Sequence, residues 1–76
     1  MASSASPSRS MDRKVTIAYL WARFQVSAAD AERLLADAEA SDTGMAPLVR
    51  EGKRTIWATH MTTQDGKFVI ETEWPS

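Results

Sequence analysis

The stretch SAADAERLLADAEA at residues 27–40 decides the fold, because it is the clearest helix in the chain. Four of its apolar residues recur at i, i+3, i+4 and i+7, the spacing that gathers side chains on one helix face: Ala31, Leu34, Leu35 and Ala38. Ser27 stands three residues before Asp30, an S-x-x-D arrangement that caps a helix N-terminus. The alanine content favours helix, and turn-forming residues follow at 41–44. We therefore predict a helix that starts after Ser27 and ends near Ala40.

The segment just before it carries a second apolar set at helical spacing: Ile17, Leu20, Trp21 and Phe24. This spacing predicts a short amphipathic helix from Thr16 onward. A strand is the alternative, because residues 15, 17, 19 and 21 also alternate and are all β-branched or aromatic.

After the long helix the apolar period changes from 3.6 to 2. Residues 54–61 are predicted to form a strand. Leu48 and Val49 precede it, and a turn at Glu51-Gly52 is predicted to join the two segments. Asp65-Gly66 is the stronger turn signal, since a type I′ turn needs positive φ at both central positions.

A two-residue turn at Asp65-Gly66 fixes a register. It places Thr63 opposite Phe68, Met61 opposite Ile70, Thr59 opposite Thr72 and Trp57 opposite Trp74. The predicted core face then holds Trp57, Met61, Phe68, Ile70 and Trp74, and the solvent face holds His60, Thr62, Glu71 and Glu73.

These elements predict an α+β fold class: two short N-terminal helices packed on a three-stranded antiparallel β-meander. Residues 1–11 are rich in serine and are expected to form a flexible tail, and residues 12–76 a single small domain. Because a core of this size needs every large side chain, we expect Trp21, Trp57 and Trp74 to be buried.

Composition excludes several classes of protein. Seventy-six residues are too few for two domains, and the absence of cysteine excludes disulfides and thiolate metal sites. The apolar run at 17–22 is too short to span a bilayer, and residues 1–14 contain no apolar signal segment, so we expect a cytoplasmic protein without a membrane partner. The net charge of −1 does not by itself indicate nucleic-acid binding, so such binding would depend on local clusters of positive charge.

Two segments suggest a family: VTIAYLWARFQVSAADAERLL at 15–35 and APLVREGKRTIW at 46–57. Together, over residues 15–57, they resemble the winged helix-turn-helix of phage excisionases and MerR-type DNA-binding domains. The resemblance implies a winged-helix-like regulator or recombination accessory factor that binds double-stranded DNA. Its second helix would enter the major groove through Ser27, Ala28, Ala29 and Arg33, and its wing would contact the backbone through Arg50, Lys53 and Arg54.

The alternative is a protein–protein interaction module, such as a small inhibitor or adaptor that binds through its hairpin or its acidic helix. Four carboxylates favour it, because they would repel phosphate from the groove helix: Asp30, Glu32, Asp37 and Glu39. The arrangement of charge discriminates between the two hypotheses. Convergence of Arg13, Lys14, Arg50, Lys53 and Arg54 on one surface favours DNA, and interleaved signs favour a protein. A homodimer is compatible with both.

An enzyme is not expected. His60 is the one histidine, and the predicted register pairs it across the strands with Glu71, which is typical of a surface histidine. The sequence contains no phosphate-binding glycine loop and no nucleophile motif. We therefore predict no catalytic, cofactor-binding or metal-binding residues.

Overall fold

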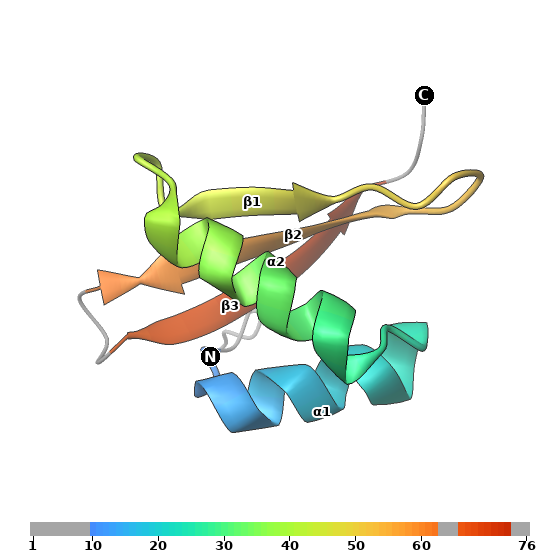
Figure 1. Ribbon diagram of the computed structural model, residues 1–76, viewed down its shortest axis with the longest axis horizontal. Coiled ribbons are helices and arrows are strands. Elements are labelled where there is room, and N and C mark those ends of the chain that lie inside the picture. The colour runs from blue at the N-terminus through green and yellow to red at the C-terminus, as the bar shows by residue number, and fades with distance from the viewer. Residues whose placement is uncertain (1–9, 63–65, 74–76) are drawn as a thin grey trace, which may run out of the picture.

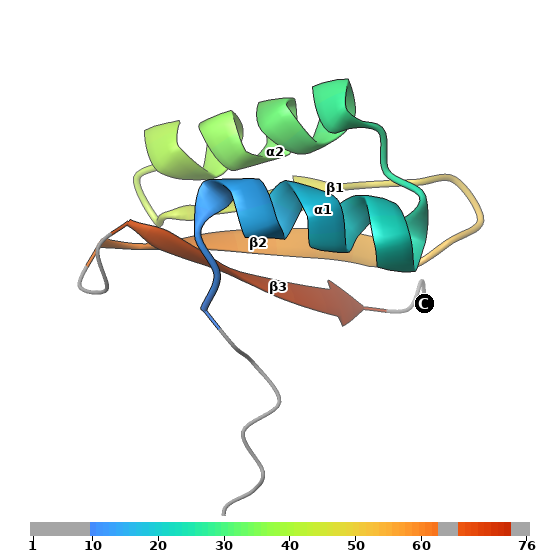
Figure 2. The same cartoon turned by 90° about the horizontal axis from the view of Figure 1, so that it is seen from below.

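Two helices cover one face of a three-stranded antiparallel sheet, so the predicted α+β fold class is confirmed (Figures 1 and 2). The structure is a computed structural model that describes residues 10–62 and 66–73; most of the predicted tail, residues 1–9, lies outside them. The sheet order is β1-β2-β3. The elements are α1 (Arg13–Phe24), α2 (Ala28–Ala40), β1 (Met45–Leu48), β2 (Thr55–Met61) and β3 (Lys67–Glu73).

The first apolar segment is a helix, and the strand alternative for it is wrong. The Asp12 side chain accepts a hydrogen bond from the Val15 N–H at 2.9 Å and so caps the N-terminus of α1. Gln25 ends the helix in the left-handed conformation, with φ 56°.

The buried face of α1 differs from the predicted one. Thr16 and Leu20 are fully buried, whereas Trp21 is 60% exposed. Trp21 lies about 40° further round the helix axis than the partly buried Ile17, and so further from the buried face that Thr16 and Leu20 define. Thr16 can be buried because its hydroxyl donates to the Asp12 carbonyl at 2.7 Å.

The predicted second helix is confirmed at both ends. Ser27 caps α2 by accepting from the Asp30 N–H at 3.2 Å, and the helix ends at Ala40. Its four predicted core residues are all buried against α1 and the sheet: Ala31, Leu34, Leu35 and Ala38.

The predicted strand register is wrong by three positions. Met61 pairs with Lys67, His60 with Phe68 and Thr59 with Val69, and Trp57 lies opposite Glu71. The connection between β2 and β3 is therefore longer than a two-residue turn; its residues 63–65, like Trp74, lie outside the described residues. A shift by an odd number turns β2 over, so Ile56 and Ala58 face the helices where Trp57 and Met61 were predicted.

Small residues explain why β2 turns this face inward. Ala58 on β2 and Ala46 on β1 are buried beneath α2, which itself buries Ala31 and Ala38. Four alanines across one interface let the helix lie close to the sheet, and a tryptophan at position 58 would hold it away. Phe68, Leu20, Leu35 and Ile56 supply the large buried side chains.

The two edges of the sheet are not equivalent. On the β3 side, Met11 forms a bridge with Phe68, in which each N–H donates to the other residue's carbonyl, at 2.8 and 2.7 Å. On the opposite side, β1 contains Pro47, which has no N–H.

Candidate functional site

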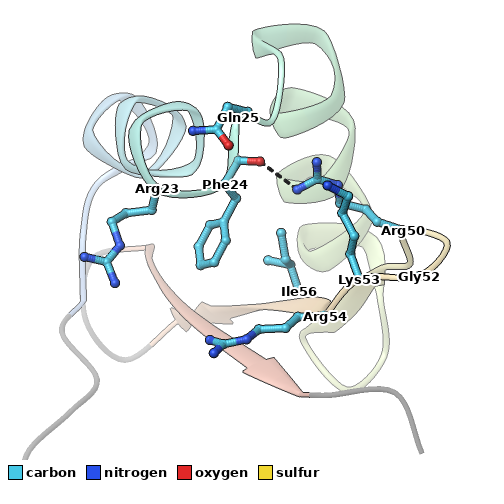
Figure 3. A pocket seen from close by; sticks show the side chains of 8 residues that line it. All are labelled: Arg23, Phe24, Gln25, Arg50, Gly52, Lys53, Arg54 and Ile56. Atoms are coloured by element: carbon cyan, nitrogen blue, oxygen red, sulfur yellow. Dashed lines mark hydrogen bonds between the residues drawn. The ribbon is translucent and has the colours of Figure 1, made fainter.

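An open pocket of about 390 Å³ lies at one end of the molecule, between the end of α1 and the β1–β2 connection (Figure 3). Phe24 and Ile56 form its apolar centre. Four basic residues from two separate segments surround this centre, and we call them the cationic cluster: Arg23, Arg50, Lys53 and Arg54. Gln25 and Gly52 complete the lining.

Local backbone geometry brings these segments together. The Lys53 N–H donates to the Arg50 carbonyl at 2.9 Å, and Gly52 has φ +72°, which closes the turn predicted at Glu51-Gly52. The ladder between β1 and β2 ends before this turn, at Leu48 and Ile56. The turn therefore extends beyond the sheet toward the end of α1.

Arg50 joins the turn to the helix. Its guanidinium donates to the Phe24 carbonyl at 2.7 Å, as the dashed line in Figure 3 marks. That carbonyl lies at the C-terminus of α1, where backbone carbonyls lack helical partners and a positive charge is favourable. Arg50 is therefore partly buried and has a structural role in addition to its charge.

The other three members of the cationic cluster are exposed. The Arg54 guanidinium donates to the Thr72 hydroxyl at 3.3 Å. Within the described part of the chain, no carboxylate lines the pocket. Four positive charges around one concave surface create a field that attracts an anionic partner.

The structure brings together three of the predicted site residues, Arg50, Lys53 and Arg54. It adds Arg23, which the sequence analysis missed; the available signal was its position in the last turn of the first helix, next to Phe24. The other predicted site residues do not line the pocket. Ser27, Ala28, Ala29 and Arg33 are all exposed. Only Val26 separates Gln25 from Ser27, the N-cap of α2, so this N-cap lies within about 7 Å of the pocket lining.

Two of the five basic residues whose convergence on one surface would favour DNA binding lie away from the pocket. Arg13 and Lys14 begin α1, about 14 Å along the helix from Arg23. The Arg13 guanidinium lies 3.2 Å from a Glu39 carboxylate oxygen and 6.0 Å from the centre of the Phe68 ring. The carboxylates of α2 at 30, 32, 37 and 39 are all exposed.

His60 does not pair with Glu71 as predicted. It lies opposite Phe68 on β3, with the two ring centres 5.2 Å apart, because of the shift in register. Residues 10–62 and 66–73 contain no group of three His, Cys, Asp or Glu side chains placed to hold a metal ion. Neither of the helices described, at 12 and 13 residues, is long and apolar enough to cross a membrane.

Comparisons with protein-family models, with curated proteins and with solved structures found no match. The resemblance to winged helix-turn-helix proteins therefore stays a prediction that rests on the sequence.

Proposed function

We propose that this protein is a small DNA-binding protein without enzymatic activity that contacts the backbone of double-stranded DNA through its cationic cluster. The observation that carries the proposal is the convergence of Arg23, Arg50, Lys53 and Arg54 on one open pocket that no described carboxylate lines. Charges arranged in this way neutralise neighbouring phosphates and release the counterions condensed on the duplex.

The members of the cationic cluster contribute differently. Lys53 is the last residue of the turn and is exposed, so it can reach a phosphate without rearrangement. Arg23 approaches from α1 on the other side of Phe24 (Figure 3). Arg50 orients the turn through its bond to Phe24 and adds positive charge to the site.

Base reading by α2 is the less supported part of the winged-helix hypothesis. Ala28, Ala29 and Arg33 are exposed and start close to the pocket, which favours a contact there. Asp30 and Glu32 share the same turns, and their charge opposes close approach of phosphates. The proposal therefore assigns affinity to the cationic cluster, and any sequence preference to Arg33 and the first turn of α2. A regulator or recombination accessory factor of the cytoplasm fits this mode of binding.

A labelled mixed-sequence duplex, titrated at low and at physiological salt, tests the proposal. We expect Lys53→Ala to weaken binding equally on unrelated sequences and to lower the slope of log K against log salt by about one. Lys14→Ala is the matched control, because it removes the same charge from an exposed position at the far end of α1, and we expect the slope to stay unchanged.

Amide chemical shifts locate the contact. Shifts at 23–33 and 50–54 that fade as salt rises would support the proposal. The proposal is wrong if the protein does not bind at low salt, because nonspecific electrostatic binding does not need the correct sequence. It is also wrong if the Lys53 and Lys14 variants lose affinity equally.

A protein partner is the second candidate function, and the exposed acidic surface of α2 favours it. Asp30 and Asp37 lie along one flank of the buried face, and Glu32 and Glu39 lie along the other, where Glu39 pairs with Arg13. All four carboxylates are exposed, and Arg33 lies between the two flanks. Such a surface attracts a basic protein segment. Shifts confined to α2 on addition of a polylysine peptide, without any response to DNA, would support this function instead.

A further inference from the structure

No described element covers the face of the sheet that points away from α1 and α2 (Figure 2). We call it the outer face. The pleat of the strands assigns residues to it, because Ala46, Ile56, Ala58 and Phe68 are buried on the opposite face and their neighbours must point outward. Its apolar members come from all three strands: Met45, Pro47, Trp57, Met61 and Val69.

The register of the strands arranges these outer residues in rows. Met45, Thr59 and Val69 form a central uncharged row across the sheet. Met61 and Lys67 form the row on one side of it. Pro47, Trp57 and Glu71 form the row on the other side.

The two charges of β3 nearest the central row are therefore opposite in sign on its two sides, and Glu73 lies one row beyond Glu71. Lys67 and Glu71 lie on the same face, each two residues or about 7 Å from Val69, in opposite directions. A rotation of 180° about an axis that runs along the central row, across the strands, exchanges the two flanking rows. Such a surface is complementary to itself, which is the requirement for a two-fold symmetric interface.

We propose that the outer face binds a second copy of this chain, sheet against sheet, with the two-fold axis along the central row. In this arrangement Lys67 of each copy faces Glu71 of the other, and Met61 faces Trp57. Val69 meets its own counterpart at the axis. The two sheets form the middle of the dimer, about 10 Å apart, and the helices lie on its outer sides.

A hollow in the outer face is suited to receive the second copy. It measures about 470 Å³ and is lined by residues of all three strands: Met45, Trp57, Glu71, Thr72 and Glu73. The Trp57 indole N–H donates to a Glu73 carboxylate oxygen at 2.7 Å, which fixes the ring along the sheet. Met61 of the second copy faces this hollow across the axis, and methionine packs readily against an aromatic ring.

The size of the face sets the affinity. β2 and β3 have seven residues each and β1 has four, so the face measures at most about 14 by 24 Å, or about 340 Å² of flat area per copy. The buried area therefore lies below that of stable interfaces, among the weak and transient ones. We therefore expect a dimer with a dissociation constant of the order of 10 μM. This surface is separate from the cationic cluster, so the dimer does not depend on the proposed function.

Sedimentation equilibrium over a range of concentrations tests the proposal. The apparent mass should rise from 8.4 kDa toward twice that value. Lys67→Glu and Glu71→Lys should each weaken the dimer about tenfold, because each replaces two attractive pairs by two repulsive ones. An equimolar mixture of these two variants should recover the affinity, since residue 67 of each chain then faces a residue 71 of opposite charge on the other chain.

Recovery in the mixture separates a contact between chains from damage within one chain. Val69→Lys gives a second test, because it brings two ammonium groups together at the axis. Lys53→Glu is the control for charge reversal and should leave the mass curve unchanged. An apparent mass that stays at 8.4 kDa up to about 0.5 mM overturns the proposal, as does a mixture no tighter than its components.

Discussion

At the scale of single residues, Gly44 joins α2 to the sheet. It has φ +76°, and its carbonyl accepts the His60 N–H at 2.7 Å. A Cβ at this position would lie 3.3 Å from the His60 carbonyl oxygen, which is backbone and cannot rotate away. The sequence identifies this glycine as a turn former, but its close approach to β2 depends on a register that the local sequence does not contain.

Substitution of Gly44 can be compared with substitution of Gly52, which has φ +72° and open space around it. Gly52→Ala carries only the strain of a positive φ, so we expect the free energy of unfolding to fall by about 1 kcal/mol. Gly44→Ala adds the backbone contact and should lower it by about 2 kcal/mol. Urea unfolding at one fixed protein concentration measures both. Equal losses would contradict the role of the His60 contact.

At the scale of elements, the helices were predictable and the register of β2 and β3 was not. Ser27 and the spacing of Leu34 and Leu35 are local signals, and they placed α2 at its observed ends. The register depends on which face of β2 meets α2, and this is decided by small residues such as Ala58. Apolar size alone favoured Trp57 and Met61, so the sequence analysis assigned the wrong face to the core.

In the candidate site, too, the local pattern was predictable and the contact between elements was not. Arg50, Lys53 and Arg54 surround one glycine turn, and this local pattern identified them. The contribution of Arg23 was not predictable, because it depends on the docking of the turn against the end of α1.

The docking of the turn leads to a prediction about Arg50. Its removal deprives the Phe24 carbonyl of a charged donor, so we expect Arg50→Ala to lower the free energy of unfolding by about 1 kcal/mol. Lys53→Ala removes a charge from the same turn without removing such a bond and should change the free energy by less than about 0.5 kcal/mol. Thermal unfolding of the two variants and the parent measures these differences in stability. If both are as stable as the parent, the Arg50 bond contributes nothing to the fold.

At the scale of the whole molecule, one small core lies between the helices and the inner face of the sheet. Leu20, Leu35, Ile56 and Phe68 are its largest apolar members. The tryptophans contribute less than expected, because Trp21 is exposed and Trp57 lies on the outer face. The stability of the domain therefore depends on a few aliphatic side chains and Phe68.

Neighbouring positions of α1 test this view of the core. Leu20→Ala leaves a cavity at a fully buried position, and we expect a loss of about 3 kcal/mol, a large part of the stability of so small a domain. Trp21→Ala removes more atoms, but the side chain is 60% exposed, so we expect a loss of less than about 1 kcal/mol. Urea midpoints measure the difference. A larger loss at Trp21 would show that the tryptophan is a core residue after all.

The pairing of Met11 with β3 affects how this chain can aggregate. An open sheet recruits further strands through free backbone groups at its edges, and repeated addition of this kind builds cross-β fibres. Here the bridge from Met11 occupies backbone groups of Phe68 at one edge, and Pro47 has no N–H to offer at the other. Lateral growth is therefore hindered at both edges, which leaves the outer face, where the proposed self-association would end at two copies.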